Sequence, residues 1–417
     1  MSIKIKKLCE KAKAASRKLA LVDTRVKDNA IKRMANALLK KKALIIKANL
    51  KDLRSAEAKG LSSALMDRLT LSSDRINAMA GSLREIAAMK DPVGEVIETT
   101  RRPNGLLIKK VSVPIGAILV IYESRPNVTS DCVGLCLKSG NSVILRGGKE
   151  AINSNIAIFR TLNAESKRCG IPDGAISIVR DTDRLVVNSL LKENSLIDLV
   201  IPRGGESLIR EVTASSRIPV IKHYKGVCHT YVDASADLGM AGDICFNAKV
   251  QRPGVCNAME TLLVSEDIAG DFLPPMIARL RRAGVEIRGC PKTIQIAGSA
   301  AKKATECDWY TEHLGLILSV RVVKGVDEAI EHIMKYGSYH SDTIVTKDKA
   351  SAGKFLARVD SACVYVNAST RFTDGSEFGK GAEIGVSTDK IHARGPMGIK
   401  ELTSYKYIIY GNGQVRK

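Results

Sequence analysis

The chain has 417 residues, of which 45% are hydrophobic, 4% aromatic and 26% charged, and its formal net charge is +21. This length predicts two or three domains, and the composition is typical of a soluble globular protein. The longest apolar run, Val111 to Tyr122, is interrupted by Pro114 and Gly116 and is too short to span a bilayer.

The net charge has three interpretations. A basic surface binds nucleic acid in many proteins, but here the basic residues are spread along the whole chain and few aromatic residues are available to stack on bases. A lysine-rich, solvated surface without a specific partner is the simplest interpretation. The third is attraction of anionic ligands, such as a phosphorylated acid and a dinucleotide.

The ten cysteines are scattered and form no C-x-x-C pair. Because there are only six histidines and no ligands clustered in the sequence, we expect no metal site. Residues 1–7 are basic but have neither an apolar block nor a cleavage site, so they do not resemble a secretory signal. Free thiols without such a signal indicate the reducing cytoplasm.

Residues 1 to about 90 are expected to be helical, because apolar residues recur there at helical spacing between charged ones. Asp91-Pro92-Val93-Gly94 ends this region. A β-hairpin is expected next, with Glu95 to Thr99 and Leu106 to Val113 on either side of the turn dipeptide Asn104-Gly105.

Strands and helices then alternate, which predicts a parallel sheet with helices on both faces. The expected strands are Ala117 to Tyr122, Ser142 to Arg146, Ile176 to Val179, Leu196 to Ile201 and Pro219 to Lys222. The helices between them are Ser130 to Ser139, Glu150 to Asn163, Asp183 to Leu191 and Ser207 to Ala214.

A second α/β half is expected to begin near Val232-Asp233. Its strands are Glu260 to Val264, Leu316 to Val323, Thr343 to Val345 and Cys363 to Val366. Its helices are Leu238 to Lys249, Asp271 to Ala283, Val326 to Tyr336 and Ser351 to Val359. The terminal segment, Leu402 to Arg416, has the pattern of a further strand.

Two glycine-rich turns stand where a predicted strand passes into a helix, Arg146-Gly147-Gly148-Lys149 and Arg203-Gly204-Gly205-Glu206-Ser207. Glycine lets backbone N–H groups approach an anion, and a helix N-terminus favours negative charge. A single such turn is most often plain turn chemistry. Two equivalent turns favour a cofactor site at the carboxyl edge of the sheet, although neither G-x-G-x-x-G nor a P-loop is present.

Cys256 lies in Gln251-Arg252-Pro253-Gly254-Val255-Cys256-Asn257, at a Pro-Gly break after a predicted helix. Spacing does not distinguish it from the other cysteines, and an arbitrary cysteine is usually a small buried hydrophobe. The segment nevertheless resembles the nucleophile region of the aldehyde dehydrogenase superfamily. With Met259-Glu260-Thr261 it resembles the gamma-glutamyl phosphate reductase (glutamate-5-semialdehyde dehydrogenase) family.

The resemblance covers essentially the whole chain through short motifs in a constant order. They are Val113 to Gly116, Glu123 to Asn127, Lys138 to Asn141, Leu145 to Ala151, Pro202 to Gly205, Cys228-His229, Tyr231 to Asp233, Ser341-Asp342, Phe378-Gly379, Glu383 to Gly385 and His392 to Pro396. It implies an α/β fold with a cofactor domain built on a parallel sheet, a second α/β catalytic domain and a small β oligomerisation element. We expect these at residues 1–226, with a projecting hairpin at 95–113, at 227–401 and at 402–417, in a homo-oligomer.

The resemblance also implies a reaction. The Cys256 thiolate attacks gamma-glutamyl 5-phosphate, phosphate leaves, and NADPH reduces the thioester to glutamate 5-semialdehyde in the second step of proline biosynthesis from glutamate. Glutamate 5-kinase would pass on the substrate by channelling. Such a thiolate needs cationic neighbours or a helix N-terminus, and the oxyanion needs N–H donors such as the Cys256 amide and a side-chain amide.

Individual residues follow from the same resemblance. Where superfamily members hold the adenine ribose with a lysine and an acidic residue, this chain has Arg146 and Lys149, and two cations favour the 2′-phosphate of NADP over NAD; the alternative is that both side chains face water. Glu312 matches the glutamate on the nicotinamide ribose. Asn127 is the candidate oxyanion donor, and Asn247 is a further candidate to line the site.

Two other functions stay open. A hydrolytic aldehyde dehydrogenase needs a carboxylate base, whereas the matching positions carry Lys222 or His223, of which only the histidine is a plausible base. A nucleic-acid-associated protein on an old dehydrogenase scaffold would explain the charge. Retention of Cys256, Glu312 and both glycine turns favours the reductase.

Overall fold

The computed structural model describes residues 3–416 and divides the chain into two compact units. Unit 1 comprises Met1–Lys222, Gly379–Gly385 and Met397–Lys417, and unit 2 comprises His223–Phe378 and Val386–Pro396. Met1, Ser2 and Lys417, at the ends of the predicted domains, lie outside the described residues. The predicted domains are continuous stretches of chain, whereas each of these units is assembled from separated segments.

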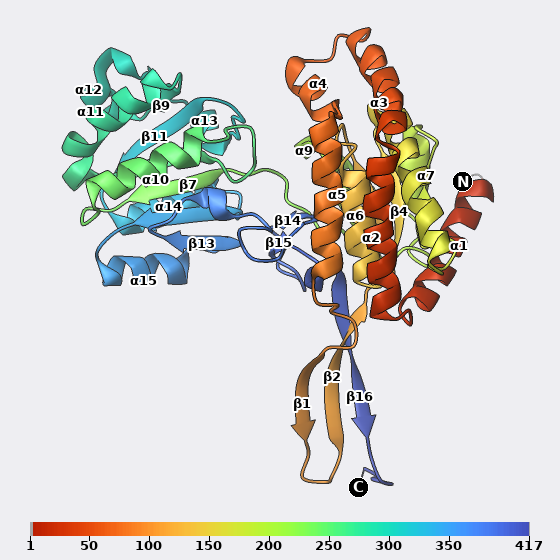
Figure 1. The fold of residues 1–417 in the computed structure, drawn as a ribbon. Coiled ribbons are helices and arrows are strands. Elements are labelled where there is room, and N and C mark those ends of the chain that lie inside the picture. The colour runs from red at the N-terminus through yellow and green to blue at the C-terminus, as the bar shows by residue number, and fades with distance from the viewer. Residues whose placement is uncertain (1–2, 417) are drawn as a thin grey trace. The chain divides into compact units, whose positions relative to one another are not determined.

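Unit 1 begins with the expected helical region (Figure 1). Its helices are α1 (Ile3–Leu19), α2 (Thr24–Lys40), α3 (Lys42–Glu57), α4 (Ser63–Leu69) and α5 (Ser73–Ala88). Apolar residues recur along α2 at helical spacing, and they are buried against the rest of the unit. The Asp23 carboxylate caps this helix by accepting a hydrogen bond from the Arg25 amide at 2.7 Å.

The predicted alternation of strands and helices is present in unit 1. The elements are β3 (Ala117–Tyr122), α6 (Val128–Lys138), β4 (Ser142–Gly147), α7 (Ile152–Arg168), β5 (Ile176–Ile178), α8 (Arg184–Leu190), β6 (Leu199–Arg203) and α9 (Glu206–Ser215). The four strands form a parallel sheet in the order β5-β4-β3-β6.

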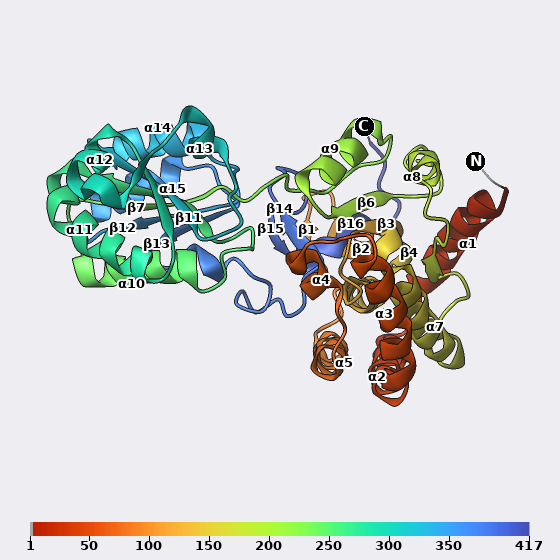
Figure 2. The same cartoon turned by 90° about the horizontal axis from the view of Figure 1, so that it is seen from above.

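Strand β3 shows how both faces of this sheet are covered. All six of its residues are buried, as expected for a strand inside a parallel sheet. Leu119 and Ile121 pack in one cluster with Ile5 and Cys9 of α1. The Tyr122 hydroxyl lies on the alternate side and is 2.7 Å from the Thr129 hydroxyl of α6. Helices therefore lie on both sides of the sheet (Figure 2).

The strand predicted at Pro219 to Lys222 is wrong. Only Val220 forms a bridge, with Val200 of β6. The backbone exchanges two hydrogen bonds there, from Val200 to the Pro219 carbonyl and from Ile221 to the Val200 carbonyl. Proline has no N–H to extend the ladder, and the chain then runs irregularly to residue 227.

The predicted hairpin is confirmed, and the terminal segment adds a third strand to it. Strands β1 (Val96–Arg101), β2 (Leu107–Pro114) and β16 (Thr403–Tyr410) form an antiparallel sheet in that order. Gly105 takes a φ of 88° in the turn, a conformation that glycine adopts without strain. Within unit 1, this sheet extends away from the helices (Figure 1).

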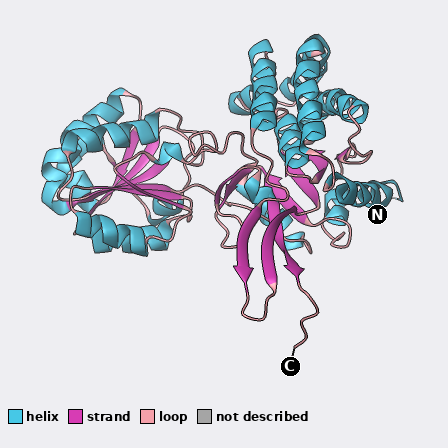
Figure 3. Cartoon of the chain, turned by 60° about the horizontal axis from the view of Figure 1, so that its bottom comes forward, coloured by secondary structure: helices cyan, strands magenta, loops and turns pink. Residues whose placement is uncertain are grey.

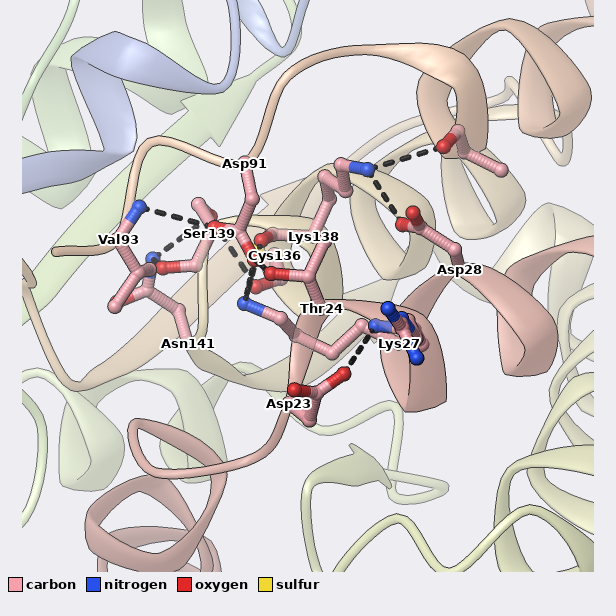
Figure 4. Close-up of polar contacts among 12 residues, drawn as sticks. Asp23, Thr24, Lys27, Asp28, Asp91, Val93, Cys136, Lys138, Ser139 and Asn141 are labelled. Carbon is pink, nitrogen blue, oxygen red and sulfur yellow. Dashed lines mark hydrogen bonds and ion pairs between the residues drawn. The ribbon is translucent and has the colours of Figure 1, made fainter. Parts of the chain in front are cut away.

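Two buried lysines hold helix ends together in unit 1 (Figure 4). The Lys27 ammonium of α2 pairs with Asp91 at 2.5 Å and donates to the carbonyl of Lys138, the last residue of α6, at 3.2 Å. The Lys138 ammonium pairs with Asp28 at 2.5 Å and donates to the Ala87 carbonyl of α5 at 3.0 Å. Carbonyls at two helix C-termini thus receive cations, which the helix dipole favours.

Unit 2 is built on a seven-stranded parallel sheet. In the order β10-β9-β11-β8-β7-β12-β13 its strands are Lys302–Lys303, Glu286–Gly289, Ile317–Val323, Met259–Ser265, Cys228–Val232, Ser341–Val345 and Cys363–Val366. Its helices are α10 (Leu238–Val250), α11 (Glu266–Arg282), α12 (Pro291–Ala297), α13 (Glu306–Tyr310), α14 (Val326–Tyr336) and α15 (Lys349–Arg358). The short strands β14 (Gly385–Ser387) and β15 (Gly395–Met397) pair with each other.

Helices cover both faces of the unit 2 sheet (Figure 3), and alternate residues of β8 pack in different clusters. Leu262 and Val264 pack in one cluster with residues of α10 and α11. Leu263 packs in another cluster with Ile333 of α14 and Phe355 of α15. Since both faces are covered, the loops at the edges of this sheet are where functional groups can meet. Among residues 3–416, no helix is both long and apolar enough to cross a membrane.

Candidate functional site

The two glycine-rich turns of unit 1 meet at one edge of its sheet. One follows β4 and the other follows β6, and β3, which lies between these strands, ends at the same edge with Glu123. A cavity of about 200 Å³ lies at this edge. Its lining includes Glu123, Arg146, Gly148, Lys149, Glu150, Thr182, Arg184, Asn188, Ser207 and Glu211. The carboxyl ends of parallel strands are the usual place for a nucleotide.

Three basic residues line this cavity. Arg146 donates to the Thr182 carbonyl at 2.8 Å and to the Gly147 carbonyl at 3.2 Å. Burial lowers the pKa of its guanidinium, which stays charged nonetheless. Lys149 and Arg184 complete the set. The sequence analysis missed Arg184. This residue is the first of α8, at the end of the connection from β5, which is the third strand-to-helix connection of the sheet.

The start of α9 already binds an anionic group. The Gly205 amide donates to the Glu123 carboxylate at 2.9 Å. Gly204 and Gly205 thus bring backbone amides to the edge, as expected for a helix N-terminus that receives an anion. The Glu206 side chain bonds Arg210 at 2.8 Å, whereas Ser207 lines the cavity.

The loop after β3 contains Asn127 and Ser124. Asn127 directly precedes α6, and its side-chain amide donates to Asp131 at 3.2 Å. Its role as the oxyanion donor stays a prediction. Ser124 has a φ of 39° and donates through its amide and hydroxyl to Glu150, at 2.6 and 2.9 Å. A strained residue of this kind is common at functional sites, but no pattern in the sequence predicted it.

Cys256 lies in unit 2, in the turn between α10 and β8. Strands β8, β7 and β12 are neighbours and run parallel, so the chain enters all three from one edge. Cys256 precedes β8, His223 precedes β7 and His340 directly precedes β12. One ligand atom from each of these side chains lies within 4.8 Å of the other two.

Hydrogen bonds hold the two histidines in place. The Nδ1 atom of His223 is 3.0 Å from the Val386 carbonyl, which can only accept, so in the neutral ring Nε2 carries the lone pair. Nδ1 of the buried His340 is 2.9 Å from the Ser341 hydroxyl. The two rings lie edge to face, with centroids 5.6 Å apart. The sequence analysis considered His223 but did not connect His340 with Cys256.

Backbone contacts position the Cys256 loop. Gly226 packs so closely that a Cβ atom there would collide with the Cys256 carbonyl oxygen, which also lies 3.2 Å from the Cys228 sulfur. The Gly226 amide donates to the Glu312 carboxylate at 2.9 Å. Glu312 precedes β11, the neighbour of β8, and therefore lies at the same sheet edge as the thiol.

A buried ion pair lies at the sheet edge where β8 begins. Lys249 of α10 and Glu260 of β8 are both fully buried, with their charged atoms 2.6 Å apart. Glu260 also accepts a hydrogen bond from the Leu314 amide at 3.1 Å, where Leu314 has a φ of 53°. Burial raises the pKa of Glu260 to about 7 and lowers that of Lys249, although each partner's charge opposes the shift.

Cationic side chains adjoin the Cys256 segment. The Arg371 guanidinium donates to the Asn257 side-chain oxygen and, at 2.9 Å, to Gln251. Arg371 interacts electrostatically with Cys256 and with Arg252. Of the other candidates, Asn247 is exposed on α10, and Lys222 belongs to unit 1 whereas His223 belongs to unit 2.

The aldehyde dehydrogenase family matches residues 2–305. Gamma-glutamyl phosphate reductase of Caldanaerobacter subterraneus subsp. tengcongensis is 58% identical over 417 residues, which is all of both chains. That of Thermodesulfovibrio yellowstonii is 57% identical over 408 residues, 98% of this chain and 97% of its own. The crystal structure of gamma-glutamyl phosphate reductase from Thermotoga maritima has a TM-score of 0.97 at 47% identity, covering 99% of this chain and 100% of its own.

The family match and the fold therefore define a member of the aldehyde dehydrogenase family. Within that family, the chain belongs to the gamma-glutamyl phosphate reductases. The predicted fold class, family and enzyme class are confirmed, and the family implies a nicotinamide cofactor.

Proposed function

We propose that this protein uses NADPH to reduce gamma-glutamyl 5-phosphate to glutamate 5-semialdehyde and phosphate, a step of proline biosynthesis. The observation that carries the proposal is the Cys256 loop, in which the thiol lies beside His223 and His340 in a chain that matches gamma-glutamyl phosphate reductases over its whole length. A thiol next to an imidazole is the arrangement of an activated cysteine nucleophile.

The residues around Cys256 support the following order of reaction steps. The Cys256 thiol gives its proton to an adjacent imidazole, for which Nε2 of His223 has the available lone pair. The thiolate attacks the acyl carbon, the bond between that carbon and the phosphate oxygen breaks, and a thioester remains. The Cys256 amide and a side-chain amide, proposed to be that of Asn127, stabilise the oxyanion.

The residues that line the cavity of unit 1 support the binding of a phosphorylated dinucleotide. Gly204, Gly205, Glu206 and Ser207 form the helix start proposed for the pyrophosphate, where the Gly205 amide binds the Glu123 carboxylate. Arg146 and Lys149, which line this cavity, would hold the 2′-phosphate that distinguishes NADP. The family resemblance assigns the nicotinamide ribose to Glu312. When bound, NADPH supplies the hydride that reduces the thioester.

Location and partners belong to the same proposal. Free cysteines and the named relatives support a cytoplasmic enzyme. The acyl phosphate substrate would be supplied by glutamate 5-kinase. The exposed apolar side chains of the β1-β2-β16 sheet support a homo-oligomer.

The test is the Cys256→Ser variant, assayed for NADPH oxidation with gamma-glutamyl phosphate. Turnover should be lost while NADPH binding and the unfolding midpoint stay as in the wild type, because a hydroxyl lacks the nucleophilicity of a thiolate. Cys307→Ser, which changes an exposed thiol on α13, is the matched control and should remain active. Activity of Cys256→Ser within about tenfold of the wild type, or about 1.4 kcal/mol, would overturn the assignment.

A further inference from the structure

We propose that His223, Cys256 and His340 form a reversible zinc site that blocks the nucleophile. The inhibitory effect rests on the proposed function of Cys256, whereas metal binding does not. Among the described residues these three side chains place one sulfur and two imidazole nitrogens within 4.8 Å of one another. Thiolate and imidazole together prefer Zn²⁺ and similar transition metals over Mg²⁺ or Ca²⁺, which prefer oxygen ligands.

The distances require only a small adjustment. Zn²⁺ binds sulfur at about 2.3 Å and nitrogen at about 2.0–2.1 Å, so tetrahedral geometry places ligand atoms roughly 3.3–3.6 Å apart. The three ligand atoms lie within 4.8 Å of one another, so movements on the order of 1 Å would bring them to these distances. Cys256 and His223 are half-buried, so rotation of their side chains can supply this movement.

The surroundings already resemble the outer shell of a metal site. Histidine ligands of metals commonly donate their second ring N–H to a backbone carbonyl. His223 does so toward Val386 at 3.0 Å, which leaves Nε2 as its ligand atom. The buried His340 is fixed by the Ser341 hydroxyl at 2.9 Å, and that hydroxyl lies 2.6 Å from the Thr373 hydroxyl. Three protein ligands leave a fourth position for water.

Binding changes the chemistry of Cys256 in a balanced way. The thiol releases its proton to the solvent, a sulfur–zinc bond forms, and no electron transfer is involved. The sulfur lone pair that would attack the acyl phosphate is then engaged. Removal of the ion by a chelator restores the thiol, so the block is reversible.

The first experiment measures binding alone, with Co²⁺ as a spectroscopic probe and Zn²⁺ in competition with a chromophoric chelator. The wild type should show a thiolate-to-cobalt charge-transfer band and release about one proton per metal. Cys256→Ser should lose the band, and both Cys256→Ser and His223→Gln should bind Zn²⁺ at least about 100-fold more weakly, since outer-shell partners alone account for about 10–100-fold. Cys307→Ser should behave as the wild type.

Equal Zn²⁺ affinity in the wild type and Cys256→Ser overturns the site. Circular dichroism and thermal melting show whether each variant is folded, and Zn²⁺ protection of wild-type Cys256 from iodoacetamide gives a readout that needs no variant. Alkylation of Cys256 at an undiminished rate in saturating Zn²⁺ also overturns it.

The second experiment measures turnover at saturating Zn²⁺, with and without a chelator. Loss of activity that the chelator reverses supports the block. If the metal binds through Cys256 and turnover continues, the zinc site stands and the nucleophile role of Cys256 is overturned. Failure of the site and failure of the proposed function therefore give different results.

Discussion

Arg146 lies near the end of β4 and Lys149 just after it, and both line the same cavity of unit 1. By the resemblance described above, Lys149 stands where a carboxylate would bind the 2′-hydroxyl of NAD. Lys149→Glu should therefore repel the 2′-phosphate and lower the NADP to NAD ratio of kcat/KM by at least about tenfold. The measurement is initial rates with both cofactors.

Lys59→Glu, which makes the same charge change at an exposed lysine after α3, is the control for this substitution. It should leave the ratio of kcat/KM values unaltered. An unaltered ratio in Lys149→Glu as well would assign the 2′-phosphate to Arg184 or to another cation instead.

His332 makes the stability of unit 2 depend on pH. Its side chain is 3% exposed, and burial, followed by the nearby His229 and Arg321, lowers its pKa to about 2. The unfolded chain takes up a proton below about pH 6.5, which the folded chain does not. The free energy of unfolding should therefore fall as the pH falls below about 6.5, by up to about 1.4 kcal/mol per pH unit.

Urea unfolding at pH 7.5 and 5.5 tests this dependence. His332→Gln should reduce the loss of stability between the two pH values by about 1.4 kcal/mol, the integral of one such group over this range. Parallel losses in the wild type and the variant would show that other groups, such as the half-buried His313, dominate. The pKa of His313 is lowered by burial to about 4.

Resemblance identified Cys256, but the sequence alone could not find its partners. His223, Cys256 and His340 are far apart along the chain and meet only because β7, β8 and β12 are neighbours in the sheet. We expected no metal site because no ligands are clustered along the chain. Spacing along the chain does not show which strands become neighbours in the sheet. The Lys249–Glu260 pair was also missed, because spacing along the chain does not show which residues of α10 face β8.

At the level of elements, periodicity predicted most of the framework and missed the less apolar strands. Strands β3 and β13 and helix α14 have the expected bounds. Strand β7 was missed because His229 and Thr230 break its apolar run, although both are fully buried. Strand β9, Glu286–Gly289, has charged residues at alternate positions and is too short for periodicity to show.

Lys138 is expected to stabilise the helix ends that it joins. Its ammonium is fully buried between Asp28 and the Ala87 carbonyl (Figure 4). Lys138→Met removes the cation and leaves the Ala87 carbonyl and the Asp28 carboxylate without their partner. Breaking a buried pair in this way typically costs about 3–5 kcal/mol, and equilibrium unfolding in urea measures the loss.

Lys18→Met is the matched control, because Lys18 is also in the last turn of a helix but is exposed. Its effect should stay within about 0.5 kcal/mol, as for most surface substitutions. Equal, small effects of the two substitutions would show that the Lys138 network contributes little to stability.

At the scale of the whole molecule, exposed apolar side chains on the β1-β2-β16 sheet indicate that the protein associates with itself. Tyr407 and Ile409 of β16 are 57% and 58% exposed, on alternate positions of the strand, and therefore share one face. An exposed apolar surface of this kind marks an interaction site. The double variant Tyr407→Lys, Ile409→Lys should shift the mass in light scattering toward the monomer, whereas Lys406→Ala on the other face should not. A wild type that is monomeric at micromolar concentration contradicts the prediction.

The same sheet has a consequence for biosynthesis. Strand β2 is its central strand, but its partner β16 leaves the ribosome only after the whole of unit 2 has been made. At typical translation rates this delay is roughly 15–60 s. During that time the nascent β1-β2 hairpin has an open edge at which another chain can pair. Lys109 and Lys110 lie on β2 and give that edge a charge that repels a second copy.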